Sequence, residues 1–115
     1  MKRPSVIPLL LAMLLLASCA EQEPQPPSDL IGRDAFVQVL ADVQLIEARI
    51  NHEMVVDQRT DSPAQRYYEE LYTERKITKD QYGRTYQWYA EHPERMKAVY
   101  EDVLTELGRR KEKGE

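Results

Sequence analysis

Apolar residues recur at steps of three and four positions along most of the chain, which is the spacing of one face of an α-helix. The longest stripe lies in a segment from about Arg33 to about Val55, and the polar run 57–61 is expected to end it. Its apolar members are Phe36, Val39, Leu40, Val43, Ile46, Ile50 and Met54. Asp42 lies on a separate polar face with Asp34 and Gln38. We therefore predict one long first helix.

Shorter helices are predicted by their start signals. Ser62 followed by Pro63 combines a preferred capping residue with a proline at the first helical position, and that helix should run to about Arg75. Thr78 with Gln81 three residues later matches a capping box for a third helix. Gly83 lies inside this helix at a cost of about 1 kcal/mol against alanine. We expect the glycine to allow another helix to approach closely.

A last helix is predicted to begin at Pro93, directly after His92. Gly108 is expected to end it, because glycine is the preferred residue just past a helix. Its apolar stripe consists of Met96, Val99, Tyr100, Val103, Leu104 and Leu107. No strand pattern, hairpin signal or repeat is present. The predicted fold is all-α, with about four helices over residues 31–110, one long helix and then a helix-turn-helix-like set of three, followed by a charged tail at 111–115.

The N-terminus has the pattern of a secretory signal. Lys2 and Arg3 precede an uncharged segment, Val6 to Ala17. Twelve residues of helix span about 18 Å, which is shorter than a hydrocarbon core of about 30 Å. The segment is therefore expected to direct export rather than to span a membrane.

Leu16-Ala17-Ser18-Cys19 matches the bacterial lipobox, in which the thiol accepts a diacylglycerol and small residues admit the peptidase. The alternative is ordinary cleavage after Ala20, since the residues around it are also small. Lipidation is preferred, with residues 1–18 as the cleaved signal peptide and an acyl lipid on Cys19. Residues 19–30 then form a Pro- and Glu-rich linker, in which Ala20 to Asp29 would span roughly 30 Å as polyproline helix.

Cleavage would change the charge of the protein. The whole chain carries 16 basic and 20 acidic residues, a net charge of −4. Loss of Lys2 and Arg3 leaves 14 basic residues and a net charge of −6. An exported, acidic protein is not expected to bind nucleic acid. With its one cysteine acylated, it has no disulfide and must be stabilised by helix packing.

Candidate chemistry is sparse. His52-Glu53 resembles the start of a zinc-protease helix, but the position four residues after His52 is valine, and His92 lies far away in the sequence. Ser28 and Ser62 have structural explanations in the linker and at a helix start. We therefore expect no catalytic residues, no metal site and no small-molecule cofactor.

Tyrosine is the one compositional excess. All seven tyrosines follow residue 66, and Trp88 lies among them. We assign most of them to the core, with hydroxyls reaching its rim. The alternative is a protein interface, because Tyr and Trp often anchor interfaces. Trp88 is predicted to be an exposed anchor, with Tyr86 and Tyr89 beside it. The basic residues 109–111 and Lys113 suit the solvated end of a helix better than a lipid contact.

The order of several motifs is familiar. These are the lipobox and short linker, the stretch Phe36 to Ala48 (FVQVLADVQLIEA), Tyr68 with Tyr72, Ile77 to Tyr82 (ITKDQY), Tyr89 with His92-Pro93-Glu94, and Val99-Tyr100 with Val103. Nearly the whole mature chain resembles a family of small Bacteroidota lipoproteins, domain of unknown function 4296. The resemblance implies an envelope location and a helical fold, but no catalytic residues. Asp42 and Glu47 are similar to its polar signature positions, and either helix packing or partner binding could explain them.

Two alternative functions are considered. The first is a non-enzymatic lipoprotein that binds an envelope protein, as an accessory subunit of an outer-membrane assembly or transport complex. The second is a small ligand-binding or hydrolytic domain in which Asp42, Glu47 or His52 converge. Ala20 after the cysteine favours the outer membrane, because an aspartate there retains bacterial lipoproteins at the inner membrane. Glu21 and Glu23 resemble acidic surface-export tags, which leaves open whether the protein faces the periplasm or the cell surface.

Overall fold

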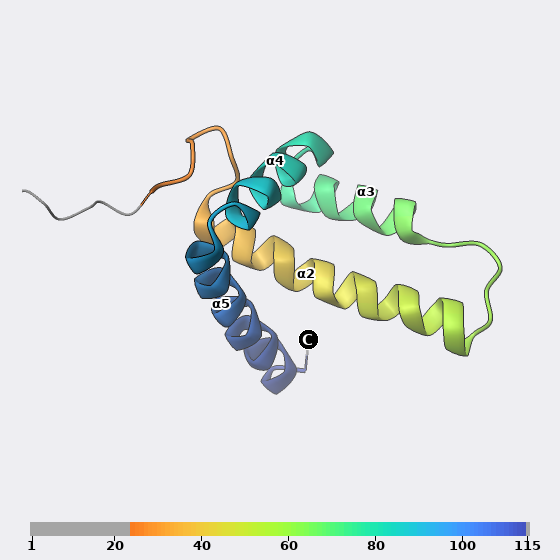
Figure 1. Ribbon diagram of the computed structural model, residues 1–115. Helices are drawn as coiled ribbons and strands as arrows, with labels where there is room; N and C mark the ends of the chain where they lie inside the picture. The colour runs from red at the N-terminus through yellow and green to blue at the C-terminus, as the bar shows by residue number, and fades with distance from the viewer. Residues whose placement is uncertain (1–23, 115) are drawn as a thin grey trace, which may run out of the picture.

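The computed structural model describes residues 24–114 and contains no strand within that range. Four α-helices follow one another, and a five-residue π-helix, η2, continues the first of them (Figure 1). The prediction of an all-α domain is confirmed. The bounds are Arg33–Asn51 for α2, His52–Val56 for η2, Ala64–Arg75 for α3, Lys79–Ala90 for α4 and Pro93–Glu112 for α5.

The core lies around the first half of α2. Phe36, which is completely buried, stacks on Tyr89 of α4 with the ring centroids 4.8 Å apart. Val99 and Val103 of α5 complete this cluster with Leu40. A second cluster joins Val39 and Val43 of α2 to Leu71 of α3. The first half of α2 is thus packed against all three later helices.

The second half of α2 extends away from this core as an arm with α3 (Figure 1). Leu45 is 50% exposed, and the apolar side chains farther along α2 are only partly buried. The predicted helix to Val55 is confirmed as a continuous helical path, but its last turn is π-helical, with the Asp57 amide donating to the His52 carbonyl at 3.2 Å. The apolar stripe therefore continues farther than the helices that cover it.

The start signals of α4 and α5 are confirmed, whereas α3 begins at Ala64, so Pro63 is its N-cap and not, as predicted, its first helical residue. The Thr78 hydroxyl accepts a hydrogen bond from the Gln81 amide at 3.0 Å, which caps α4. The Gln81 side chain donates to the Asp29 carbonyl, so the second half of the predicted capping box is replaced by a longer-range contact. Pro93 occupies the first turn of α5, and the Ser62 hydroxyl accepts from the Ala64 amide at the start of α3.

Three local expectations are wrong. Gly108 does not end α5, which continues to Glu112, because Arg109 and Arg110 bind back to Glu106 and support another turn. Among residues 24–114, no helix approaches Gly83 closely, and a Cβ added there would meet no atom within 4 Å. Leu104 is 69% exposed, since that side of α5 has no helix packed on it within the described residues.

The segment before α2 lies against α4 and α5. The Arg95 guanidinium donates to the Pro24 carbonyl at 2.8 and 3.1 Å, and Arg84 pairs with Asp29 at 2.5 Å. The Ile31 amide donates to the hydroxyl of Thr85, which is completely buried, at 3.0 Å. We call residues 24–31 the strap. The second half of the predicted linker is thus attached to the domain, whereas the predicted signal peptide and Cys19 lie outside the described residues.

Candidate functional site

Four tyrosines form a row on the surface of α3 and α4. Tyr68 and Tyr72 are four residues apart on α3, and Tyr82 and Tyr86 are four apart on α4, so each pair shares one face of its helix. Successive ring centroids are 6.2, 6.0 and 6.2 Å apart, and neighbouring rings are tilted by 40–50°. We call these four residues the tyrosine ladder.

An open groove runs beside the ladder. Its volume is about 660 Å³, and its sides come from α3 and from the start of α4. The lining residues are Ala64, Gln65, Tyr68, Glu69, Tyr72, Lys79 and Tyr82. Apolar ring surface thus lies next to an exposed carboxylate and an exposed ammonium group.

The ladder tyrosines in the groove keep their protons well above neutral pH. Burial raises the pKa of Tyr82 to about 12 and also raises the pKa of Tyr72. Burial, together with the hydrogen bond that its hydroxyl donates to Glu47, raises the pKa of Tyr68. The charge at the groove is therefore carried by Glu69 and Lys79, with Glu47 beside Tyr68.

The predicted aromatic anchors are distributed differently. Trp88 is half-buried, with its ring edge-on to Tyr89 at 4.9 Å and stacked on His92 at 4.0 Å. Tyr89 is only 2% exposed, because it faces Phe36 in the core. The expectation that Trp88 is an exposed anchor is therefore wrong, and Tyr89, which does lie beside it, belongs to the core. Tyr86 is 40% exposed and belongs to the ladder.

Sequence reasoning missed the other ladder residues, because it assigned them to the core. Tyr68, Tyr72 and Tyr82 are only partly buried. Their four-residue spacing within α3 and α4 was visible in the sequence, but it cannot distinguish a covered face from an open one. That distinction depends on where α5 packs, and α5 packs on the first half of α2 instead.

Asp42 has a structural role in the described fold. Its carboxylate accepts hydrogen bonds from Arg75 of α3 at 2.6 Å and from Arg110 of α5 at 2.7 Å. Arg110 also donates to Gln38 and to Glu106, at 2.8 and 2.9 Å. This cluster joins three helices through one acidic position. The hydrogen bonds from Arg109 and Arg110 hold the pKa of Glu106 far below its usual range.

Glu47 lies at the edge of the ladder, where it accepts the hydrogen bond from Tyr68. His52 is exposed at the far end of α2, and its Nε2 atom lies 3.8 Å from Oδ1 of Asp57. Asp42, Glu47 and His52 thus have separate partners, and the structure does not bring them together. Within residues 24–114, no group of three or more His, Cys, Asp or Glu side chains could hold a metal ion.

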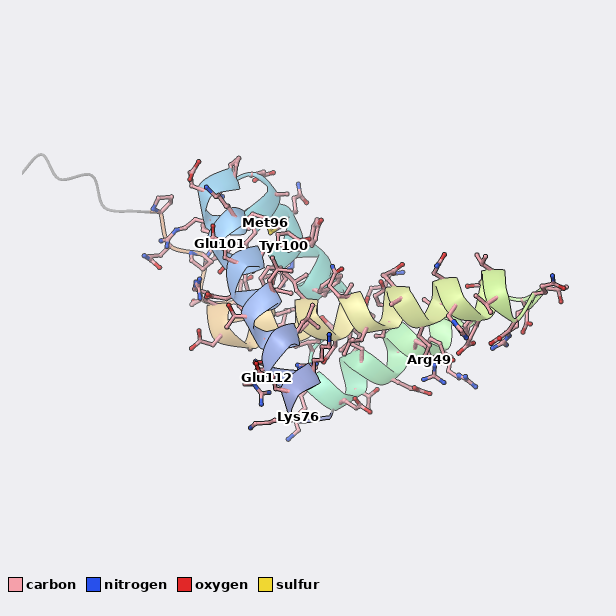
Figure 2. All side chains as sticks on the ribbon, turned by 90° about the horizontal axis from the view of Figure 1, so that it is seen from below. Arg49, Lys76, Met96, Tyr100, Glu101 and Glu112 are labelled. Carbon is pink, nitrogen blue, oxygen red and sulfur yellow. The ribbon has the colours of Figure 1, made fainter. Side chains whose placement is uncertain are left out.

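A second charged cluster lies at the far end of the arm. Glu53 accepts hydrogen bonds from Tyr67 at 2.5 Å, from Arg49 at 2.9 Å and from Arg59 at 2.7 Å. These hydrogen bonds lower the pKa of Glu53 to about 2, and the bond from Tyr67 has the largest effect. Arg49 also lies over the Tyr67 ring, with its guanidinium carbon 4.3 Å from the centroid. Figure 2 shows Arg49 on the arm, away from α5.

Comparison with known proteins gives one family. The family model described as domain of unknown function (DUF4296) matches residues 27–113, which is most of the chain. No curated protein and no solved structure gives a significant match. In the part of the chain that the structure describes, no helix is long and apolar enough to cross a membrane.

Proposed function

We propose that this chain, which belongs to the family of domain of unknown function 4296, is a non-enzymatic lipoprotein of the bacterial cell envelope that binds another envelope protein. A lipid on Cys19 would anchor it, with the outer membrane as the favoured address. Its helical domain would serve as an accessory subunit of an assembly or transport complex.

The observation that carries the anchor is the lipobox, Leu16-Ala17-Ser18-Cys19, which directly follows an apolar segment. The strap is consistent with an anchor at Cys19. Its hydrogen bonds at Pro24 and Asp29 attach the chain to the folded domain only a few residues after this cysteine. A lipid at Cys19 would then hold a defined corner of the domain near the bilayer.

The observation that supports protein binding is the tyrosine ladder. Its rings come from two helices and remain at least partly exposed, and three of them, Tyr68, Tyr72 and Tyr82, line an open groove. Tyrosine combines a large contact area with a hydroxyl, and for this reason it is enriched at protein interfaces. The carboxylates expected for the hydrolytic alternative are committed to other partners, Asp42 to two arginines and Glu47 to Tyr68.

The anchor is tested by feeding labelled palmitate to cells that make the wild-type chain or the Cys19→Ala variant. We expect label in the wild type only. Equal labelling of both proteins would contradict the anchor. The matched control is Ser18→Ala, which keeps a small residue before the cysteine and should be labelled like the wild type.

Partner binding is tested by crosslinking in intact cells, followed by identification of the crosslinked proteins. The wild type should give a defined adduct with an envelope protein at native expression. Recovery of the chain only as a free monomer would contradict the accessory-subunit role. Cys19→Ala, run in parallel, shows whether the adduct requires the anchor.

A further inference from the structure

Carboxylates outnumber ammonium groups around the groove beside the tyrosine ladder when Glu47, bonded to one of its lining tyrosines, is counted with the lining. Glu69 is exposed on its wall, and Glu47 lies at its edge, bonded to the Tyr68 hydroxyl. Lys79 supplies the single ammonium group on the α4 side. The lining and its edge together carry two carboxylates and one ammonium group, and the tyrosines themselves are uncharged. The electrostatics of the groove favour a positively charged occupant.

The arrangement of the aromatic rings indicates which kind of chemical group the groove could bind. Neighbouring ladder rings are tilted by 40–50°, so they do not form one flat platform. Tyr68, Tyr72 and Tyr82 are only partly buried, and the faces of aromatic rings carry negative π density. A cation over an aromatic face within about 6 Å is attracted by the ring quadrupole.

The chain already contains this interaction elsewhere. Tyr67, the residue before Tyr68 in α3, has the guanidinium carbon of Arg49 4.3 Å from its ring centroid and that of Arg66 at 5.1 Å. The arm therefore stabilises arginine on tyrosine beside a carboxylate, since Arg49 also pairs with Glu53. The ladder combines tyrosines with carboxylates in the same way.

We propose that the groove lined by Tyr68, Tyr72 and Tyr82 binds an arginine side chain on a basic segment of the partner protein. This inference rests on the proposed protein-binding function and adds the chemistry of the partner. The guanidinium stacks on the rings of Tyr68 and Tyr72, and Glu69 and Glu47 accept its hydrogen bonds. Arginine suits this position better than lysine, because its planar group combines stacking with several donors.

The test titrates the purified full chain, in a neutral detergent, with two blocked pentapeptides. One has the sequence Gly-Gly-Arg-Gly-Gly, and the other has citrulline, a neutral isostere, in place of arginine. We expect saturable changes in the NMR signals of the Tyr68, Tyr72 and Tyr82 rings with the arginine peptide only. Equal responses to the two peptides, or changes confined to other parts of the surface, would overturn the proposal.

Single substitutions test the contribution of the aromatic ring and that of the charged side chains separately. Tyr72→Leu should weaken binding about two- to five-fold, whereas Tyr72→Phe, which keeps the π face, should bind like the wild type. Glu69→Gln should weaken binding, and Lys79→Gln should strengthen it. The matched control is Glu70→Gln, because Glu70 lies outside the groove on the next position of α3.

The outcomes distinguish this proposal from the wider function. The titration needs neither membrane nor partner. If the groove did not respond to the arginine peptide, the arginine site would be refuted, whereas the results of palmitate labelling and crosslinking would be unaffected. Conversely, a saturable response lost in Tyr72→Leu would support the site even if crosslinking recovered only monomer. Weaker binding in Lys79→Gln would also refute the proposed electrostatics.

Discussion

Replacing Arg110 by methionine tests whether the charged cluster around Asp42 holds α5 against α2. The side chain of Arg110 is 12% exposed, that of Asp42 is 17% exposed, and their closest atoms are 2.7 Å apart. Methionine keeps most of the apolar stem and removes the guanidinium. The change therefore measures mainly the loss of the hydrogen bonds to Asp42, Gln38 and Glu106.

The expected magnitude follows from the partial exposure. Breaking a fully buried ion pair costs about 3–5 kcal/mol, whereas an exposed pair contributes about 0–1 kcal/mol. Asp42 retains Arg75 at 2.6 Å in the variant, and solvent reaches both sides of the cluster. We therefore expect Arg110→Met to lower the free energy of unfolding by about 2–3 kcal/mol.

Urea unfolding followed by helical circular dichroism measures this loss. With a slope of about 1–3 kcal/mol/M, the midpoint should fall by roughly 0.7–3 M. Arg109→Met is the control, because Arg109 binds the same Glu106 but its side chain is 43% exposed. The control should lose less than about 1 kcal/mol. If Arg110→Met costs no more than Arg109→Met, the cluster does not hold α5.

Three further predictions concern single positions. Gly83→Ala should stabilise the protein by about 1 kcal/mol, since α4 has open space there, and a loss in thermal unfolding would contradict this. Thr78→Ala should cost about 1 kcal/mol by the same assay, because it removes the cap on the Gln81 amide, while Thr78→Ser should restore it. Glu53 has a lowered pKa, so its contribution is present above about pH 4.5 and is lost as pH falls toward 2. Tyr67→Phe should move that loss to higher pH in unfolding measured between pH 7 and 2, and an unchanged pH profile would refute the role of the Tyr67 hydroxyl.

Local chemistry explains which parts of the fold could be predicted. Thr78 and Pro93 act within one turn of their own helices, so their signals correctly placed two helix starts. Gly108 carries the same kind of signal, but contacts from Arg110 to residues about 70 positions earlier outweigh it. A stop signal of modest strength is overridden when the next turn makes tertiary hydrogen bonds.

The candidate site was harder to predict because it depends on which helix faces are left uncovered. The spacing of Tyr82 and Tyr86 shows that they share a face, and it does not show whether another helix lies on it. For Trp88 the prediction was wrong in the opposite direction, because a side chain expected to be exposed is partly covered. The turn at His92 places an imidazole ring on its face. Asp42 was recognisable as a distinctive polar position, but its two arginine partners are 33 and 68 residues away.

The strap sets how far from its anchor the domain can work. A free chain from Cys19 to Asp29 could extend to about 36 Å, but the stretch from Cys19 to Pro24, where the strap begins, reaches at most about 18 Å. With the proposed lipid on Cys19, the corner formed by α4 and α5 stays within a few water layers of the lipid headgroups. The arm of α2 and α3 leads away from that corner (Figure 1). The end of the domain that carries the strap would then stay close to the membrane, and a partner would have to bind it at the membrane surface.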